Sequence, residues 1–532
     1  MAETVPAGAS HMSSPPKLTG RAFYESIGSP KYIVAPMVER SEFAWRLLTR
    51  SYLDEERSKS LLAYTPMLHA RLFRETAGFR DDHFRPVRGS LRSTEKSSSS
   101  PFLDGNPSLD RPLFVQFCAN KPEDLLEAAQ YVAPYCDAVD LNLGCPQGIA
   151  RCGRYGAFLQ EDWVTIYKMI NKLHNELTVP VTAKMRILDT REKTLEYAKM
   201  ILSAGASILT VHGRRREQKG HNTGVADWSM IRYLREHLPP ETVIFANGNI
   251  LNSGDLESCL VATGADGVMS AEGNLSDPTI FANPPTEYNP REYWYGADGT
   301  GGYRMDAVFR RYLDIIYRYS LDKEPPTRKP LYVPGDLEDN THTAVPKSEI
   351  RPSKRQARGP KQKFDPSVRS MQGHLFQLLR PLVSIHTDIR DALATTRCGD
   401  IDGYERVLAM VEAAVKKGLD DHAASQQAKS ETTNEDDVTK ESQSDLMPRR
   451  KAEMKYRRPW WVCQPYIRPL PDEAIKLGSM QPSKKNTAKM RLRETTESKD
   501  YAIQRADDLE SQDQPLHHAA REDLPKPTLV FG

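Results

Sequence analysis

The sequence has little of what marks a disulfide-stabilised, zinc-binding or membrane-spanning chain. It contains seven cysteines in 532 residues, an odd number scattered from Cys118 to Cys463, which does not suit a disulfide framework. No two of them have the CxxC spacing typical of structural zinc, and eighteen apolar residues never occur together as a membrane span requires. We therefore expect free thiols, no metal and no membrane segment, in a cytoplasmic or nuclear protein.

An excess of one charge is also missing, because 73 basic and 71 acidic residues leave a net charge of only +2. Affinity for a polyanion would have to come from local groups. Residues 351–363 hold six basic side chains and no acidic one, and the basic stretch 449–458 leads into Trp460 and Trp461. Such groups can neutralise phosphates and stack on bases. A solvated loop or a nuclear-import signal is the alternative for the first stretch, and the aromatic residues could instead dock back onto the barrel.

Short apolar runs alternate with amphipathic stretches between residues 31 and 273. Most of the stretches have helical spacing, and such alternation predicts a parallel sheet. Eight strands with helices in about 250 residues match the size of a (β/α)8 barrel, and a doubly wound open sheet is the alternative. The eight runs are residues 31–37, 61–67, 113–119, 138–144, 179–187, 208–213, 243–250 and 266–273.

The predicted barrel occupies residues 28–282 and follows a flexible N-terminus, residues 1–27. Between its second and third strands the pattern is interrupted at about residues 70–112, where four consecutive serines and several prolines occur. A segment of this length and composition predicts an insertion on the surface.

The remainder of the chain predicts a helical domain and a tail. Residues 283–420 have helical apolar spacing, broken by a polar insertion at about residues 321–370. Residues 421–532 are rich in Ser, Glu, Asp, Lys and Gln, a composition typical of disorder. A basic and aromatic island at residues 449–469 lies within this largely disordered tail.

Polar and small residues recur at the carboxyl ends of the predicted strands, where barrels of this kind hold their active sites. One lysine in a strand is usually solvated and one histidine is usually a core residue, but recurrence at the same end of successive strands is hard to attribute to chance. In chain order the residues are Pro36, Met37, Val38, Gln116, Asn142, Cys145, Lys184, Arg186, His212, Arg214, Asn247, Gly248, Asn249, Ser270, Ala271, Glu272 and Gly273.

The last two strands end in the small-residue sequences ANGNI and MSAEG. Small residues let backbone N–H groups approach a ligand closely. A helix follows each of these strands, and the N–H groups at its N-terminus favour a phosphate site. Ordinary glycine turns are the alternative. Lys184 and His212 would face the open end of the barrel, where a fixed cation and a hydrogen-bond donor or acceptor that titrates near neutrality suit the electron-rich edge of a flavin.

Seven motifs together resemble the flavin-dependent tRNA-dihydrouridine synthases over roughly residues 28–420. They are APMVERSEFAWR, FVQFCAN, DLNLGCPQGIARCGRYGAFL, TAKMRI, VHGRRREQKG, ANGNI and GADGVMSAEG. The long cysteine loop followed by RYGAFL, together with the tail island RRPWWVCQPYIRP, is similar to the eukaryotic subfamily that modifies positions 16 and 17 of the tRNA D-loop. The resemblance implies FMN as cofactor, NADPH or NADH as reductant and a tRNA uridine as substrate, and we expect a monomer.

The resemblance also implies roles for individual residues. Cys145 matches the proton donor, and Asn142 matches a contact to the substrate base. Arg186 and Arg214 are further candidates for substrate contacts. The positions that match FMN contacts are Pro36, Met37, Val38, Gln116, Lys184, His212, Asn247, Gly248, Asn249, Ala271 and Glu272.

The sequence departs from the family pattern at two places. Ala271 and Glu272 stand where related subfamilies usually have a glycine–arginine pair, which leaves open how the FMN phosphate is held. Arg215 stands where threonine is common and adds positive charge near the open end of the barrel.

The chemistry explains why a thiol lies in the glycine-rich loop. Reduction of the uracil C5=C6 bond requires a hydride on C6 and a proton on C5 from the other face, and an ordinary thiol keeps its proton at pH 7. A loop suits a tRNA base that must leave its stack to react, and Gly144 and Pro146 shape the turn. Cys118, Cys136 and Cys259 lie in apolar or helical runs typical of inert buried thiols, and Cys152 could be structural.

Two other functions remain compatible with the residues. A small-molecule reductase of the dihydroorotate or dihydropyrimidine type would share the barrel, FMN and a cysteine acid, but it would need neither the helical domain nor the basic stretches. A barrel that only binds RNA would not need the combination of Cys145, Lys184 and His212.

Overall fold

The computed structural model describes residues 17–89, 100–220, 223–296, 301–336, 364–431 and 458–468. All of them belong to one compact unit that spans Met1–Leu470. The basic stretch 351–363 and the basic residues before Arg458 lie outside the described residues. Among the helices of these ranges, none is long and apolar enough to cross a membrane.

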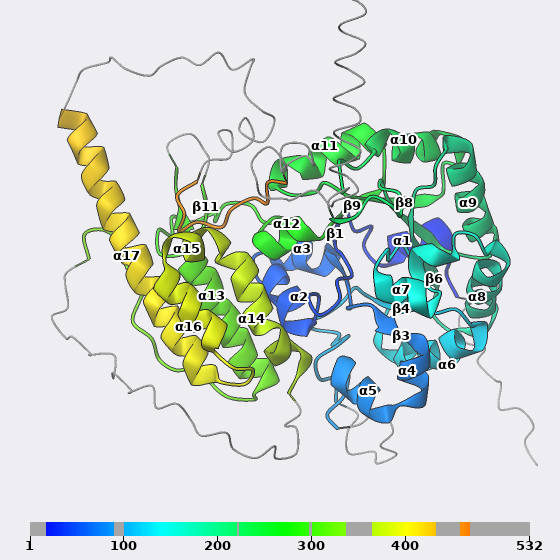
Figure 1. Cartoon of the computed structure of the whole chain (residues 1–532), viewed down its shortest axis with the longest axis horizontal. Helices are drawn as coiled ribbons and strands as arrows, with labels where there is room; N and C mark the ends of the chain where they lie inside the picture. The colour runs from blue at the N-terminus through cyan, green and yellow to red at the C-terminus, as the bar shows by residue number, and fades with distance from the viewer. Residues whose placement is uncertain are drawn as a thin grey trace, which may run out of the picture. The chain divides into compact units, whose positions relative to one another are not determined.

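Eight parallel strands close into a barrel (Figure 1). Strand β2 pairs with both β1 and β4, which completes the ring. Each strand lies inside one of the eight predicted runs, so the (β/α)8 barrel is confirmed and the open sheet is excluded. The barrel strands are β1 (Tyr32–Val34), β2 (Leu62–Tyr64), β4 (Leu113–Cys118), β5 (Ala138–Leu143), β6 (Val181–Arg186), β7 (Ile208–His212), β8 (Val243–Asn247) and β9 (Gly267–Ser270).

Amphipathic helices surround the strands because each has one apolar face. In α8 (Trp163–Glu176) the buried side chains Ile166, Met169 and Ile170 follow helical spacing, and Asp162 caps the helix by accepting the N–H of Thr165 at 3.1 Å. Such caps stabilise helices by about 1 kcal/mol. The other helices between barrel strands include α2 (Phe43–Arg50), α3 (Glu55–Ser60), α6 (Pro122–Val132), α9 (Arg191–Ser203), α10 (Trp228–His237) and α11 (Ser253–Thr263).

A short helix, α1 (Gly20–Ser26), packs against the residues of the barrel interior. Its Phe23 stacks on Phe114 of β4 with ring centroids 5.9 Å apart, and Tyr24 contacts Phe245 of β8. The segment predicted as a flexible N-terminus, residues 1–27, therefore contains a helix at residues 20–26. Burial of its two aromatic side chains offsets part of the entropy lost when this short helix is ordered.

The segment predicted as a surface insertion, 70–112, is partly built into the core. It contains α4 (Ala70–Glu75) and α5 (Ala77–His83), preceded by β3 (Leu68–His69), which pairs with β4. Arg46 of α2 is fully buried and forms ion pairs with Asp104 at 2.8 Å and Asp110 at 2.5 Å. A buried arginine requires such partners, so the end of this segment supports α2.

The helical domain predicted after the barrel is present and shares a core with α2. Leu48 and Tyr52 at the end of α2 pack with Val308 and Phe309. Helix α17 continues past residue 420, so its last turns fall in the region predicted as a disordered tail. The elements are a hairpin of β10 (Tyr293–Trp294) and β11 (Gly302–Tyr303), then α13 (Met305–Ile315), α14 (Pro366–Leu378), α15 (Arg380–Ile385), α16 (Thr387–Thr395) and α17 (Ile401–Glu431).

Buried polar contacts join the barrel to this helical domain. The indole of Trp45 in α2 donates to Asn274 of α12 (Glu272–Ser276) at 2.9 Å and stacks on His374 of α14 with ring centroids 3.9 Å apart. The same imidazole lies 3.0 Å from Glu42. Because all these groups are buried, the helical domain is held against the barrel through α2 and α12.

The two tryptophans of the tail island dock on the helical domain rather than on the barrel. Trp461, Val462 and Cys463 are buried in the helical core. Gly418 of α17 provides the space, since a Cβ there would lie 2.7 Å from the ring of Trp460. Segment 458–468, drawn in orange in Figure 1, continues from this anchor toward α12.

Candidate active site

A cavity of about 400 Å³ opens at the carboxyl ends of the barrel strands. Pro146 and Gln147 of the cysteine loop line one side of it, and Arg468 of the tail segment lines another. Many of the residues predicted from the strand ends also line it, namely Met37, Arg186, His212, Arg214, Asn247, Gly248, Asn249, Ala271 and Glu272.

The other predicted residues lie around this cavity. Lys184 contacts the cavity wall through Asn247, and Gln116 and Asn142 are buried in the strands that precede the cysteine loop. Pro36 is half-buried and Val38 is exposed, on either side of the lining residue Met37. The structure thus gathers most of the predicted residues at one end of the barrel, and their individual ligand contacts stay predictions.

The cysteine loop is held by hydrogen bonds from both sides. The side-chain oxygen of Asn142 accepts the backbone N–H groups of Gly144 at 3.1 Å and Cys145 at 2.9 Å. The carbonyl of Cys145 accepts the N–H of Ala157 at 3.1 Å. Gly156 has φ +65°, and a Cβ there would lie 2.8 Å from the Cys145 carbonyl oxygen. The glycine of RYGAFL is therefore needed for the close approach of this segment to the thiol-bearing residue.

A chain of buried hydrogen bonds leads from Asn142 into the barrel. The Asn142 amide donates to Gln116 Oε1 at 2.8 Å, and Gln116 Nε2 donates to Asp140 at 2.8 Å. Thr182 donates to the other carboxylate oxygen of Asp140 at 2.6 Å. Burial raises the pKa of Asp140 to about 6. The sequence reasoning missed Asp140, although strand alternation places it on the same face as Asn142.

Two residues predicted to face a flavin have perturbed acid–base behaviour. Lys184 Nζ donates to Asn247 Oδ1 at 2.9 Å, and burial, with the nearby charge of Arg186, lowers the pKa of Lys184 to about 8. Burial and the same positive neighbours lower the pKa of His212 well below its ordinary value, so its imidazole is neutral at pH 7. Arg214 lies 3.1 Å from His212 Nε2, and since a guanidinium only donates, this nitrogen accepts.

The ANGNI turn gives the cavity its shape at the end of β8. Gly248 has φ +110°, and a Cβ there would lie 2.7 Å from Ala226 and 2.9 Å from the His212 ring. Asn249 accepts a hydrogen bond from Arg214, which also donates to the Gly224 carbonyl at 3.0 Å. The glycine thus keeps this wall close to His212 without steric conflict.

Cationic side chains connect the loop after β7 to the cysteine loop. Arg186 Nε donates to the Gly144 carbonyl at 2.8 Å, and its NH1 donates to the Arg215 carbonyl at 3.0 Å. Lys219 donates to the carbonyl of Pro146. Two loops that lie far apart in the sequence therefore form one rim beside the cavity.

The charge of the cavity suits an anionic ligand. Lys184, Arg186, Arg214 and Arg468 contribute positive charge, and Glu272 is the carboxylate among the lining residues. Burial, with repulsion from Arg468 and Arg186, lowers the pKa of Arg214 to about 9. In the described ranges no group of three or more His, Cys, Asp or Glu side chains could hold a metal ion.

The cysteines differ in their environments. Cys118, Cys136 and Cys259 are buried, as predicted for inert thiols, whereas Cys145 is partly exposed. Cys152 lies exposed in α7 (Gly148–Gly153), so nothing in its packing indicates a structural role.

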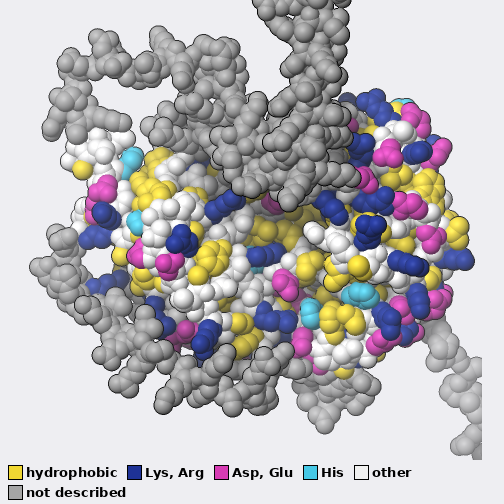
Figure 2. Space-filling model, viewed as in Figure 1, with side chains coloured by type: hydrophobic (Ala, Val, Ile, Leu, Met, Phe, Trp, Pro, Cys, Tyr) yellow, Lys and Arg dark blue, Asp and Glu magenta, His cyan; other side chains and the backbone are white. Residues whose placement is uncertain are grey.

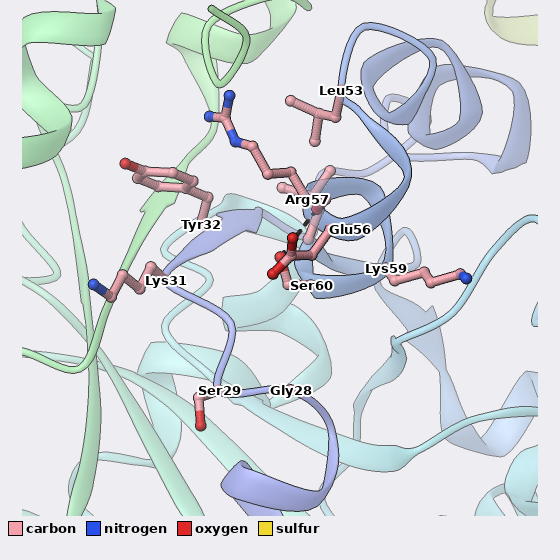
Figure 3. Close-up of a pocket in the computed structure, with 10 residues that line it drawn as sticks. Gly28, Ser29, Lys31, Tyr32, Leu53, Glu56, Arg57, Lys59 and Ser60 are labelled. Atoms are coloured by element: carbon pink, nitrogen blue, oxygen red, sulfur yellow. Dashed lines mark hydrogen bonds between the residues drawn. The ribbon is translucent and has the colours of Figure 1, made fainter.

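A second cavity, of about 480 Å³, lies at the opposite end of the barrel (Figure 3). Lys31 and Tyr32 at the start of β1, Leu61 just before β2, and Arg57 of α3 are among its lining residues. Barrel enzymes carry their chemistry at the carboxyl ends, and the amino-terminal end contributes to stability. We therefore assign the chemistry to the first cavity.

A (β/α)8 barrel with a partly exposed thiol on a constrained loop and a cationic cavity at the strand ends defines a barrel enzyme with a site for an anionic cofactor. The chain belongs to the dihydrouridine synthase (Dus) family, whose model matches residues 33–324. The family membership indicated by the motifs is thereby confirmed.

Curated relatives match over nearly their whole length. A tRNA-dihydrouridine(16/17) synthase of Schizosaccharomyces pombe is 44% identical over 457 residues, which cover 85% of this chain and 92% of the relative. Its counterpart in Saccharomyces cerevisiae is 40% identical over 91% of this chain and 96% of the relative. A similar protein of Rattus norvegicus is 36% identical over 88% of this chain and 82% of the relative.

Proposed function

We propose that this chain is an FMN-dependent tRNA-dihydrouridine synthase, which uses NADPH or NADH to reduce the C5=C6 bond of uridines 16 and 17 in the tRNA D-loop. The observation that carries the proposal is the partly exposed Cys145 on a loop that Asn142 and Gly156 hold beside the cationic cavity. The names of the relatives, which cover most of this chain, support the positions and the reductant.

The residues of the cavity fit a flavin mononucleotide. FMN, when bound, supplies the hydride for C6 of the base. Lys184 would hold the ring edge where negative charge develops on reduction, and neutral His212 offers a donor without adding charge. Gly248 lets backbone and ligand approach closely, and the cationic groups suit a phosphate.

Cys145 would donate the proton to C5 of the base. A thiol serves because it is protonated at pH 7 and its thiolate can recover a proton from water. The hydrogen bonds to the Cys145 N–H and carbonyl fix the backbone of this residue. An acid that is already held in reactive geometry loses less entropy in the transition state than a freely moving one, so the activation free energy is lower.

The tRNA would approach the end of the barrel that carries the cysteine loop, with its target base turned out of the stack. We expect the helical domain, residues 283–420, to be the main tRNA platform. Figure 2 shows dark blue Lys and Arg side chains on both the helical and the barrel parts of one face. Such groups bind phosphates without reading sequence.

The test uses the purified full-length chain with FMN and NADPH. We expect rapid oxidation of the reduced flavin by unmodified tRNA but not by free uracil or orotate, with dihydrouridine mapped to positions 16 and 17. Turnover of free pyrimidines alone would favour the small-molecule reductase. Binding of tRNA without any dihydrouridine would favour the RNA-binding barrel.

A further inference from the structure

Segment 458–468 is anchored firmly on the helical domain. The carbonyl of Trp461 accepts the N–H of Met305 at 2.8 Å, and Cys463 N–H donates to the Tyr303 carbonyl at 2.9 Å. Val462 pairs with Arg304 in an antiparallel bridge. The burial of Trp461, Val462 and Cys463 adds apolar contacts, so the start of this segment has a defined position.

The other end of the segment reaches the barrel. The N–H of Tyr466 donates to the carbonyl of Leu251, just after the ANGNI turn, at 3.3 Å. Two residues later, Arg468 forms an ion pair with Glu272, which follows β9. The guanidinium of Arg468 also lies over the Tyr466 ring, 5.7 Å from its centroid. The segment therefore connects the helical domain to the ends of β8 and β9.

Arg468 is directed into the cavity and is largely withdrawn from solvent. It is one of the lining residues, and 18% of its side chain is exposed. Its charge contributes to the lowered pKa values of His212 and Arg214. The ion pair with Glu272 offsets part of the repulsion between Arg468 and the neighbouring Arg186 and Arg214, and a bound anion would offset more of it.

We propose that Arg468 binds the phosphate group of FMN, so that the C-terminal segment completes the cofactor site from outside the barrel. This inference rests on the FMN dependence proposed above. Phosphate sites of (β/α)8 barrels lie after the last two strands, and that position here carries Glu272, whose charge alone would repel a phosphate. Arg468 neutralises this carboxylate, and a guanidinium has enough donors to serve a phosphate as well.

The experiment compares two flavins that differ only in the phosphate. Dissociation constants for FMN and riboflavin are measured with the full-length chain and its Arg468→Ala variant, at one stated salt concentration. We expect the variant to lose roughly 10- to 100-fold in FMN affinity, as for one charge-assisted contact. Its riboflavin affinity should stay within about twofold of the wild type, because the ring contacts are untouched.

Two further variants sharpen the test. Arg468→Lys should give an intermediate FMN affinity, because lysine keeps the charge but loses the planar fork. Arg380→Ala is the matched control, since Arg380 also lies over the Tyr466 ring, 5.6 Å from its centroid, and is not among the cavity-lining residues. Its FMN affinity should equal that of the wild type.

The outcomes separate this inference from the function on which it rests. Wild-type protein that binds neither flavin would contradict the proposed function itself. Wild-type binding of FMN with an unchanged Arg468→Ala variant would overturn the role of Arg468 alone. If Arg468→Ala lost equal affinity for FMN and riboflavin, Arg468 would stabilise the fold rather than bind the phosphate. If the variant kept its affinity for both flavins and lost affinity for tRNA, Arg468 would contact the RNA. Both results would also overturn the proposal.

Discussion

The side-chain oxygen of Asn142 accepts the backbone N–H of Cys145 at 2.9 Å, so the position of the proposed proton donor depends on the orientation of one buried amide. Ionised Asp140 can only accept hydrogen bonds, and therefore the nitrogen of Gln116 faces it. The oxygen of Gln116 then faces the nitrogen of Asn142. The Asn142 oxygen is therefore free to accept the N–H groups of the loop. The carboxylate of Asp140 thus determines which atom donates and which accepts in every hydrogen bond from Gln116 to the loop.

Replacing Cys145 by Ala separates the two half-reactions. Reduction of the flavin by NADPH needs no acid at the base, so its rate should stay near normal. Oxidation of the reduced flavin by tRNA should slow about a hundred- to ten-thousand-fold, as expected for loss of a general acid. Stopped-flow absorbance of each half-reaction measures both rates. Cys152→Ala is the control, and because Cys152 is exposed, neither rate nor stability should change much. Rapid tRNA-dependent oxidation in Cys145→Ala would eliminate Cys145 as the donor.

Replacing Asp140 by Asn should disturb the cysteine loop without touching the thiol. An asparagine at position 140 can donate a hydrogen bond to Gln116. The side-chain amides of Gln116 and Asn142 could then rotate by 180°, which would place the Asn142 nitrogen against the N–H groups of the loop. Losing these hydrogen bonds should slow the tRNA half-reaction about tenfold or more. Flavin reduction by NADPH should change less. Equal rates in wild type and variant would show that the polarity of the chain is not set by Asp140.

Asp140 also predicts how stability depends on pH. The ordinary pKa of an aspartate is about 3.9, and burial raises that of Asp140 to about 6. Between these values the native state binds more protons than the unfolded state, so the contribution of Asp140 to the free energy of unfolding falls as pH rises. Urea denaturation from pH 4.5 to 7 should show the wild type losing stability relative to Asp140→Asn up to about pH 6. A stability difference between wild type and Asp140→Asn that does not change with pH would contradict the raised pKa of Asp140.

The barrel could be predicted from the sequence because parallel strands buried on both faces form nearly continuous apolar runs. Polar residues at the ends of such runs, like Lys184 and His212, therefore indicate the site. Residues whose partners are distant in the sequence could not be found in this way. Nothing near Asp104 or Asp110 indicates that they pair with Arg46.

The position of Arg468 was equally hidden. The sequence shows the aromatic island, but its docking depends on the space above Gly418 and on backbone hydrogen bonds with Tyr303 and Met305. This segment is short and has neither helical nor strand periodicity, so its apolar residues do not predict where it packs. The composition of the tail predicts disorder apart from this island, and only tertiary contacts locate residues 458–468.

The lowered pKa of Lys184 predicts how the affinity for FMN depends on pH. Burial and Arg186 lower this pKa to about 8, so Lys184 is mostly protonated at pH 7 and mostly neutral at pH 9. Its attraction for an anionic cofactor is present below about pH 8 and is lost above it. The ratio of FMN affinities between wild type and Lys184→Met should therefore shrink from pH 7 to pH 9, measured by flavin fluorescence. A ratio that stays constant would mean that Lys184 does not act through its charge.

Arg215 should contribute to tRNA binding and not to cofactor binding. Half of its side chain is exposed on the loop after β7, its nearest acidic partner, Asp189, lies 3.9 Å away, and it is not one of the cavity-lining residues. Arg215→Ala should weaken tRNA binding severalfold and reduce the slope of log affinity against log salt by about one, as for one lost phosphate contact. FMN affinity should stay unchanged, because Arg186 uses only the backbone carbonyl of Arg215.

The matched control is Arg232→Ala, an equally exposed arginine of α10 that pairs with Glu236 at 2.9 Å. Filter binding over a range of salt concentrations measures both variants, and an equal loss in the two would mean that the tRNA does not contact the loop after β7 through Arg215.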